Sequence, residues 1–270
     1  AYQKQQQEIS ELKDFVARNK ARVATRNMAM SRQKKLDKMD VIELAREKPK
    51  PEFQFKTART PSRFVVETKE LVIGYDEPLS KPLTLTVERG EKIALTGANG
   101  IGKTTLLKIL AGYERPESGE VLLDGTPLER FRGYVPVQMI WQHPELSVNP
   151  ARRLKTVLAE GDWPEDGGIM RGRIEKEMGI LEEWKERYPA EVSGGELQRF
   201  SIARALGQRT EILLADEITA MLDLITQRQI WSALLKETQS RGISLVAVSH
   251  SQELLEKICS RILHLSAISG

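Results

Sequence analysis

One eight-residue run constrains this 270-residue chain more than any other feature: Gly97-Ala98-Asn99-Gly100-Ile101-Gly102-Lys103-Thr104. It fits the phosphate-loop pattern G-x-x-x-x-G-K-[ST], and it lies between a strand-like run, Ile93 to Thr96, and a helix-like run, Thr104 to Leu110. Glycines let the backbone close around phosphates with its N–H groups inward, while Lys103 and the positive end of the helix balance the negative charge. We therefore predict that this loop and the next residue, Thr105, bind a nucleotide, with the Thr104 hydroxyl on Mg²⁺.

A second run, Ile212 to Glu217, predicts a buried strand that ends in two carboxylates. Ligands of open α/β sheets bind at the carboxyl ends of the strands, so Asp216 is expected beside the phosphate loop. There Asp216 would hold Mg²⁺ through water, and Glu217 would polarise the water that attacks the γ-phosphate. Taken alone, the pair could equally be an acidic helix N-terminus.

A third segment, Val192 to Arg199, opens a helix with Ser193 as the expected N-cap and with Gly194 and Gly195 leaving backbone N–H groups exposed. Alone it is an ordinary capped helix. Placed after the phosphate loop and before the carboxylate strand, it resembles the signature L-S-G-G-Q of the ATP-binding cassette (ABC) superfamily. Val192 stands for Leu and Glu196 for Gln, a variant that the superfamily contains.

The resemblance implies further catalytic positions. His250, after the run Val246 to Ser249, matches the switch histidine that contacts the γ-phosphate and orients the attacking water with Glu217. Gln142, after the run Val137 to Trp141, matches the glutamine that reaches Mg²⁺, and it fits better than Gln138, which falls within the predicted strand.

The resemblance also implies a shared site. Tyr75 would stack on adenine, with strand packing as its alternative, and Asp223 would cross the interface between two cassettes. The phosphate loop of one cassette closes on the signature of another. One chain would therefore bind MgATP alone but hydrolyse it efficiently only in a head-to-tail pair, with itself or with another cassette.

One departure falls next to the catalytic carboxylate. Ile218 stands where the family commonly has proline, which removes a φ constraint. We expect a looser loop that still permits hydrolysis.

The pattern along the chain predicts an α/β P-loop fold of ABC type. We expect a mixed sheet around the phosphate-loop helix, an antiparallel β subdomain and a small helical subdomain at about 145–205. The predicted domains are a helical basic arm (1–48), a proline-rich connector (49–63) and the ATPase domain (64–270). Within the arm, Ile9 to Val16 and Leu36 to Ile42 are the helical segments, and Arg18 to Lys35 is expected to project from them. Because Ala1 falls inside a predicted helix, the start is either a truncation or the chosen end of an expressed fragment.

Charge is concentrated in the arm. Residues 1–60 hold 15 Lys and Arg against 8 Asp and Glu, whereas the whole chain holds 41 against 38. Such an arm is either a solvated helix or a nucleic-acid contact. The single cysteine, Cys259, and the absence of a signal-like or membrane-length apolar run favour a cytoplasmic location, with the cytoplasmic face of a membrane as the alternative.

Two finer resemblances point to different partners. Residues 1–125 look like the second half of an ABC-F protein, the soluble tandem-cassette class that acts on ribosomes and RNA. Residues 137–265 look like the ATPase subunit of an oligopeptide or nickel importer, which needs a membrane permease. We therefore hold three hypotheses: an ABC-F-type ATPase as the main one, an importer subunit, and a chimeric cassette that binds nucleotide without physiological coupling.

Overall fold

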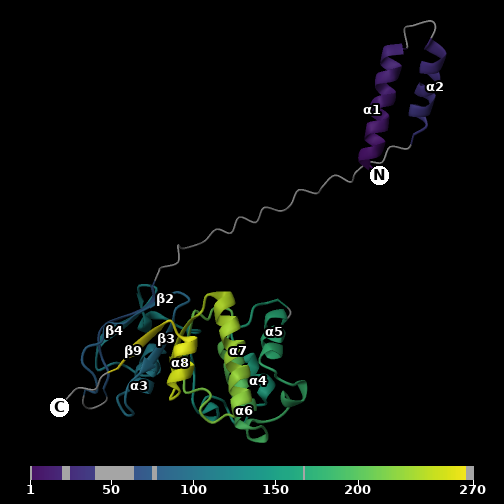
Figure 1. Cartoon of the computed structure of the whole chain (residues 1–270). Helices are drawn as coiled ribbons and strands as arrows, with labels where there is room; N and C mark the ends of the chain where they lie inside the picture. The colour runs from purple at the N-terminus through teal and green to yellow at the C-terminus, as the bar shows by residue number, and fades with distance from the viewer. Residues whose placement is uncertain (1, 20–24, 40–63, 75–77, 167, 266–270) are drawn as a thin grey trace. The chain divides into compact units, whose positions relative to one another are not determined.

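The structure, a computed structural model, describes residues 2–19, 25–39, 64–74, 78–166 and 168–265. The chain separates into two compact units, residues 1–58 and 59–270 (Figure 1). Each unit is described by itself below. None of the helices in the described ranges is both long enough and apolar enough to span a membrane.

The described residues of the first unit form a pair of helices, α1 (Tyr2–Asn19) and α2 (Arg26–Asp37). Ile9 and Val16 of α1 and Ala29 of α2 are buried, and the Arg32 guanidinium lies 3.6 Å from the centre of the Phe15 ring. The prediction that residues 18–35 project from two flanking helices is wrong, because the second helix begins at Arg26, inside that stretch. The small Ala29 side chain allows this close packing despite the lack of large apolar residues.

The second unit contains a parallel sheet with the strand order β6-β7-β8-β3-β9. Its strands are β3 (Lys92–Thr96), β6 (Val137–Ile140), β7 (Ile212–Asp216), β8 (Ser244–Val248) and β9 (Arg261–His264). The phosphate loop leads from β3 into α3 (Lys103–Leu110). A second, antiparallel sheet has the order β2-β1-β4-β5, with β1 (Phe64–Val72), β2 (Thr86–Glu88), β4 (Ser118–Leu123) and β5 (Thr126–Pro127). The α/β fold of ABC type is confirmed, with parallel and antiparallel pairing divided between the two sheets.

The helices of the second unit are short except for the one that follows β7. Besides α3, the described residues form α4 (Leu154–Ala159), α5 (Ile169–Glu177), α6 (Gly194–Ala205), α7 (Leu224–Arg241) and α8 (Gln252–Ile258), with 3₁₀ turns at Leu128–Arg130, Pro144–Leu146, Glu182–Trp184 and Pro189–Glu191. The sequence suggests one helical region over 153–187, but Gly161, Pro164 and Gly168 divide it into separate helices. Helix α6 packs against α4, α5 and α7 (Figure 1).

The parallel sheet lies between two apolar cores, which explains its continuous apolar strands. Leu213 and Ala215 of β7 pack with the helical segments, whereas Ile212 and Leu214 pack with α3 and the antiparallel sheet. All five residues of β7 are buried, including Asp216 at its carboxyl end. The core therefore fixes the position of that carboxylate from both faces of the sheet.

Candidate nucleotide site

The carboxyl ends of four parallel strands meet at one edge of the sheet, and each carries a residue that the sequence singles out. Strand β3 leads into the phosphate loop, β6 leads to Gln142, β7 ends in Asp216 and Glu217, and β8 leads to His250. Since β7 and β8 are neighbours and β8 also pairs with β3, these segments are close in space although they are far apart in the sequence.

The phosphate loop needs glycine where the backbone packs most tightly. Gly97 has φ +143°, and a Cβ there would lie 2.5 Å from the Leu265 carbonyl oxygen and against the Ile101 side chain. Lys103 Nζ donates hydrogen bonds to the carbonyl oxygens of Gly97 (2.7 Å) and Ala98 (2.9 Å). The ammonium group is therefore held over the loop, where it can meet the phosphates of a ligand.

Asp216 is a buried carboxylate, 3% exposed, at the end of β7. Burial raises its pKa; a hydrogen bond from Thr104 opposes this rise, and the adjacent Glu217 carboxylate adds to it. The side chains of Thr104 and Asp216 thus meet, as the predicted Mg²⁺ site requires. A carboxylate that is costly to ionise in the free chain is well suited to a bound cation.

Glu217 is held on both sides by the other two predicted catalytic residues. Its Oε2 accepts a hydrogen bond from Gln142 Nε2 (3.2 Å), and its Oε1 lies 2.9 Å from His250 Nε2. Glu217 has φ +48°, a left-handed conformation that is strained for a residue with a side chain, and its N–H donates to the Val248 carbonyl oxygen. In contrast, Gln138 Nε2 donates a hydrogen bond to the carbonyl oxygen of Val135, just before β6.

The loop after Glu217 is anchored by packing. Ile218 is 2% exposed and belongs to the larger apolar core, and Thr219 accepts a hydrogen bond from Trp231 Nε1 (3.1 Å) in a buried position. Apolar burial therefore holds the Ile218 side chain in place, and the expected looser loop stays a prediction.

The signature segment forms the capped helix start that the sequence indicates. Ser193 Oγ accepts from the Glu196 N–H (3.3 Å), and Glu196 Oε2 accepts from the Ser193 N–H (2.7 Å), which completes a capping box on α6. Ser193 and Gly194 are exposed. Asp223 caps α7 through the N–H groups of residues 225 and 226. The predicted role of Asp223 between cassettes is not tested in one chain.

Two cavities adjoin the catalytic residues. One of about 400 Å³ is lined by the phosphate loop, Gln142, Glu217, His250 and Leu79. The other, about 350 Å³, shares Lys103, Glu217 and His250 and reaches Ile262 and His264 on β9. Sequence reasoning missed β9, whose only signal is the short Arg-Ile-Leu-His run after α8. Tyr75 lies outside the described residues.

Comparisons with known proteins agree with this geometry. The model of the ABC transporter family matches residues 80–220, and a second model with the same description, ABC transporter, matches residues 1–55. The ABC transporter ATP-binding protein YfmM of Bacillus subtilis is 45% identical over 268 residues, which cover 96% of this chain and 47% of that protein. The chain therefore spans about half the length of this relative. Because one alignment covers nearly the whole chain, a chimera is not supported.

Shorter relatives and solved structures match the cassette. The nickel import ATP-binding protein NikE of Rhodospirillum rubrum is 34% identical, over 67% of this chain and 69% of that protein. A dimeric ATP-binding cassette solved in a post-hydrolysis state with ADP and phosphate superposes with a TM-score of 0.65 at 25% identity, covering 74% of this chain and 94% of the other. The chain belongs to the ABC transporter family and carries one of its ATPase cassettes.

Proposed function

We propose that this chain binds MgATP and hydrolyses it to ADP and phosphate as one half of a head-to-tail pair of cassettes. The observation that carries the proposal is that Gln142 and His250 both contact the Glu217 carboxylate, next to the cavity lined by Lys103 and Thr104. Three side chains from three different strand ends converge there, which a purely structural acidic turn would not need.

The chain's own groups account for the steps of this reaction. The Lys103 ammonium and the amides of residues 100–104 bind the phosphates. The Glu217 carboxylate orients a water molecule and accepts its proton while the water oxygen bonds to the γ-phosphorus and the bond to the leaving β-phosphate oxygen breaks. His250 and Gln142 keep Glu217 aligned for this transfer.

The residues also fit a magnesium ion held together with the nucleotide. Thr104 and Asp216 would hold the ion and Gln142 would reach it, while the ion would supply positive charge to the phosphate oxygens. Among the described residues, no group of three or more His, Cys, Asp and Glu side chains could hold a metal. Phosphate oxygens and water would therefore complete the coordination.

Pairing with a second cassette is part of the proposal. Gly194 is exposed at the start of α6, where the first N–H groups of a helix have no carbonyl partner within the helix, and Met221, Leu224 and Ile225 beside Asp223 are 72%, 81% and 72% exposed. Anion-binding amides and an apolar rim on one chain suit a surface that closes over the nucleotide of another.

Phosphate release by the purified chain tests this function. We expect turnover that rises faster than linearly with chain concentration, that Glu217→Gln abolishes, and that Lys103→Ala abolishes together with nucleotide binding. Nucleotide affinity should survive in Glu217→Gln. A Lys103→Ala chain that binds ATP as tightly as the parent would contradict the proposed site.

We propose that ATP hydrolysis by this chain drives a membrane permease. Other relatives that are as similar to this chain as NikE also carry transport names, including the peptide transport system ATP-binding protein SapF. Beside Gln142, the Trp141 and Tyr113 rings lie 5.3 Å apart, and Leu146, four residues further along the chain, is 76% exposed. A permease helix would cover apolar side chains of this kind. The names of these relatives differ in solute, so we propose none.

The basic arm favours a second candidate, an ABC-F-like ATPase that acts on a ribosome or RNA. Exposed cationic side chains lie along α1 and α2 and just after α2, among them Lys13, Arg18, Arg26, Arg32, Lys34 and Lys38. The first relative is about twice as long as this chain, as a tandem-cassette protein would be. The permease candidate places the chain on the cytoplasmic face of a membrane, whereas this one places it in the cytoplasm.

Sedimentation separates the two candidates. If the partner is a permease, the chain should sediment with inverted membrane vesicles, and Leu146→Asp should release it from them. Neither the parent nor the variant should then sediment with ribosomes. An RNA partner should instead give binding to ribosomes that falls steeply with salt and that Lys34→Glu weakens. Absence of salt-sensitive ribosome binding would count against the second candidate.

A further inference from the structure

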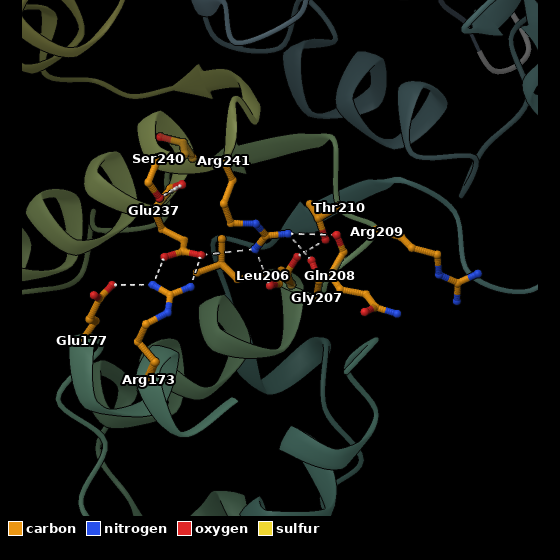
Figure 2. A network of polar contacts seen from close by, with 12 residues as sticks. Arg173, Glu177, Leu206, Gly207, Gln208, Arg209, Thr210, Glu237, Ser240 and Arg241 are labelled. Atoms are coloured by element: carbon orange, nitrogen blue, oxygen red, sulfur yellow. Dashed lines mark hydrogen bonds and ion pairs between the residues drawn. The ribbon is translucent and has the colours of Figure 1, made fainter. Parts of the chain in front are cut away.

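An ion-pair network centred on the buried Glu237 joins α5, α7 and the end of α6 (Figure 2). Glu237 on α7 is 1% exposed, and both of its carboxylate oxygens accept hydrogen bonds from Arg173 on α5, with distances of 2.6 Å from Nη1 and 2.8 Å from Nη2. Such a two-point pair fixes the relative orientation of its two helices as well as their distance.

Arg241, one turn after Glu237, extends the network to the end of α6. Its Nη1 lies 3.4 Å from Glu237 Oε1 and donates to the Leu206 carbonyl (2.8 Å), while its Nη2 donates to the carbonyls of Gly207 (2.5 Å) and Gln208 (3.2 Å). Leu206 is the C-cap of α6. The guanidinium group therefore satisfies the carbonyl of the C-cap and those of the next two residues, and it opposes the negative end of the helix dipole.

The opposite end of α6 is the signature segment, Ser193 to Gly195. A helix of this length spans about 18 Å, so a tilt of about 10° at the Arg241 end moves the signature by about 3 Å. A misplacement of about 1 Å is enough to impair catalysis strongly. The position of the signature thus depends on how firmly the far end of its helix is held.

Stability alone is a weak reason for such a network, because apolar side chains of similar volume often replace a buried ion pair without loss. The two-point contact of Arg173 and the carbonyl contacts of Arg241 specify a geometry that apolar packing does not. We propose that Arg173, Glu237 and Arg241 are positioning residues that orient the signature helix α6 toward the nucleotide bound by a second cassette. This inference rests on the proposed function, since it requires a shared site.

Glu237→Gln tests the inference, with Glu253→Gln as the matched control. Glu253 forms an exposed pair with Lys257 within α8, so the control removes a carboxylate that joins no two elements. We expect Glu237→Gln to retain nucleotide affinity within about twofold and to raise the chain concentration for half-maximal phosphate release by about tenfold or more. The control should match the parent in both measurements.

Mixing two defective chains provides the readout that a merely structural role would not move. A Lys103→Ala chain lacks a working phosphate loop but keeps its signature, and a Glu237→Gln chain has the opposite combination. Their mixture should release phosphate faster than the sum of the two alone, because one of the two shared sites is then intact. Arg173→Lys, which keeps the cation but loses the two-point contact, should behave in the same way if Glu237→Gln does not fold.

The outcomes separate the inference from the proposed function. If the parent shows concentration-dependent turnover and the folded Glu237→Gln or Arg173→Lys chain follows the same curve, the network does not position the signature. Loss of nucleotide affinity in these variants, or a mixture that stays inactive, also overturns the inference and leaves the pairing of cassettes standing. Turnover by the parent that is independent of concentration instead overturns the paired site itself.

Discussion

Replacing Asp216 by asparagine should stabilise the nucleotide-free chain at neutral pH. Burial raises the folded-state pKa of Asp216 above its ordinary value of 3.8, which means that ionising this carboxyl costs folding stability. This cost is absent below the pKa of the unfolded chain and is complete above the folded-state pKa. Asparagine has nearly the same shape, accepts the hydrogen bond from Thr104 and carries no charge.

The expected gain is about 1 kcal/mol, typical of neutralising a residue kept for function, and in a unit of this size it raises Tm by about 2–4 °C. Thermal unfolding at pH 7.5 and near pH 4 measures it, and the gain should shrink in acid as Asp216 of the parent takes up its proton. MgADP should protect the variant less than the parent.

Asp223→Ala is the control of opposite sign. The hydroxyl and N–H of Thr226 lower the pKa of Asp223, so this carboxylate stabilises the fold above its unfolded pKa and that contribution is lost as pH falls. Asp223→Ala should therefore lower Tm at pH 7.5. A lower Tm for Asp216→Asn at that pH, or a difference from the parent that grows in acid, would refute the assignment of Asp216 as a buried carboxylate that is costly to ionise.

Three further predictions concern packing. Gly97→Ala should abolish nucleotide protection in a thermal-shift assay, because the added Cβ meets the Leu265 carbonyl and φ is +143°; full protection would contradict this account of the loop. Burial raises the pKa of the Cys259 thiol to about 11, so at pH 8 only about one thiol in a thousand is ionised, and iodoacetamide should label the folded chain far more slowly than the unfolded chain. Trp231→Phe should lower Tm by about 2–4 °C through the lost bond to Thr219, and Thr219→Val should add little to it, as a double-mutant cycle would show.

Much of the candidate site was readable from the sequence because its chemistry is local. A phosphate loop needs consecutive residues between a strand and a helix, and a capped helix start needs Ser193 and Glu196 three positions apart; both patterns are found where they were expected. Short helices were harder to place. Helix α2 packs through the small Ala29, which hydrophobic periodicity does not detect, and glycine and proline divide the region before α6.

Residue type and spacing were enough to identify the side chains that can bind phosphate and the carboxylates beside them, because that chemistry depends on neighbouring residues in the chain. The folded chain was needed to show that Gln142 and His250 contact the two carboxylate oxygens of Glu217, that Ile218 is buried, and that Arg173, Glu237 and Arg241 converge. These contacts join segments brought together by strand order and core packing, and no local pattern of the chain encodes which distant side chains meet.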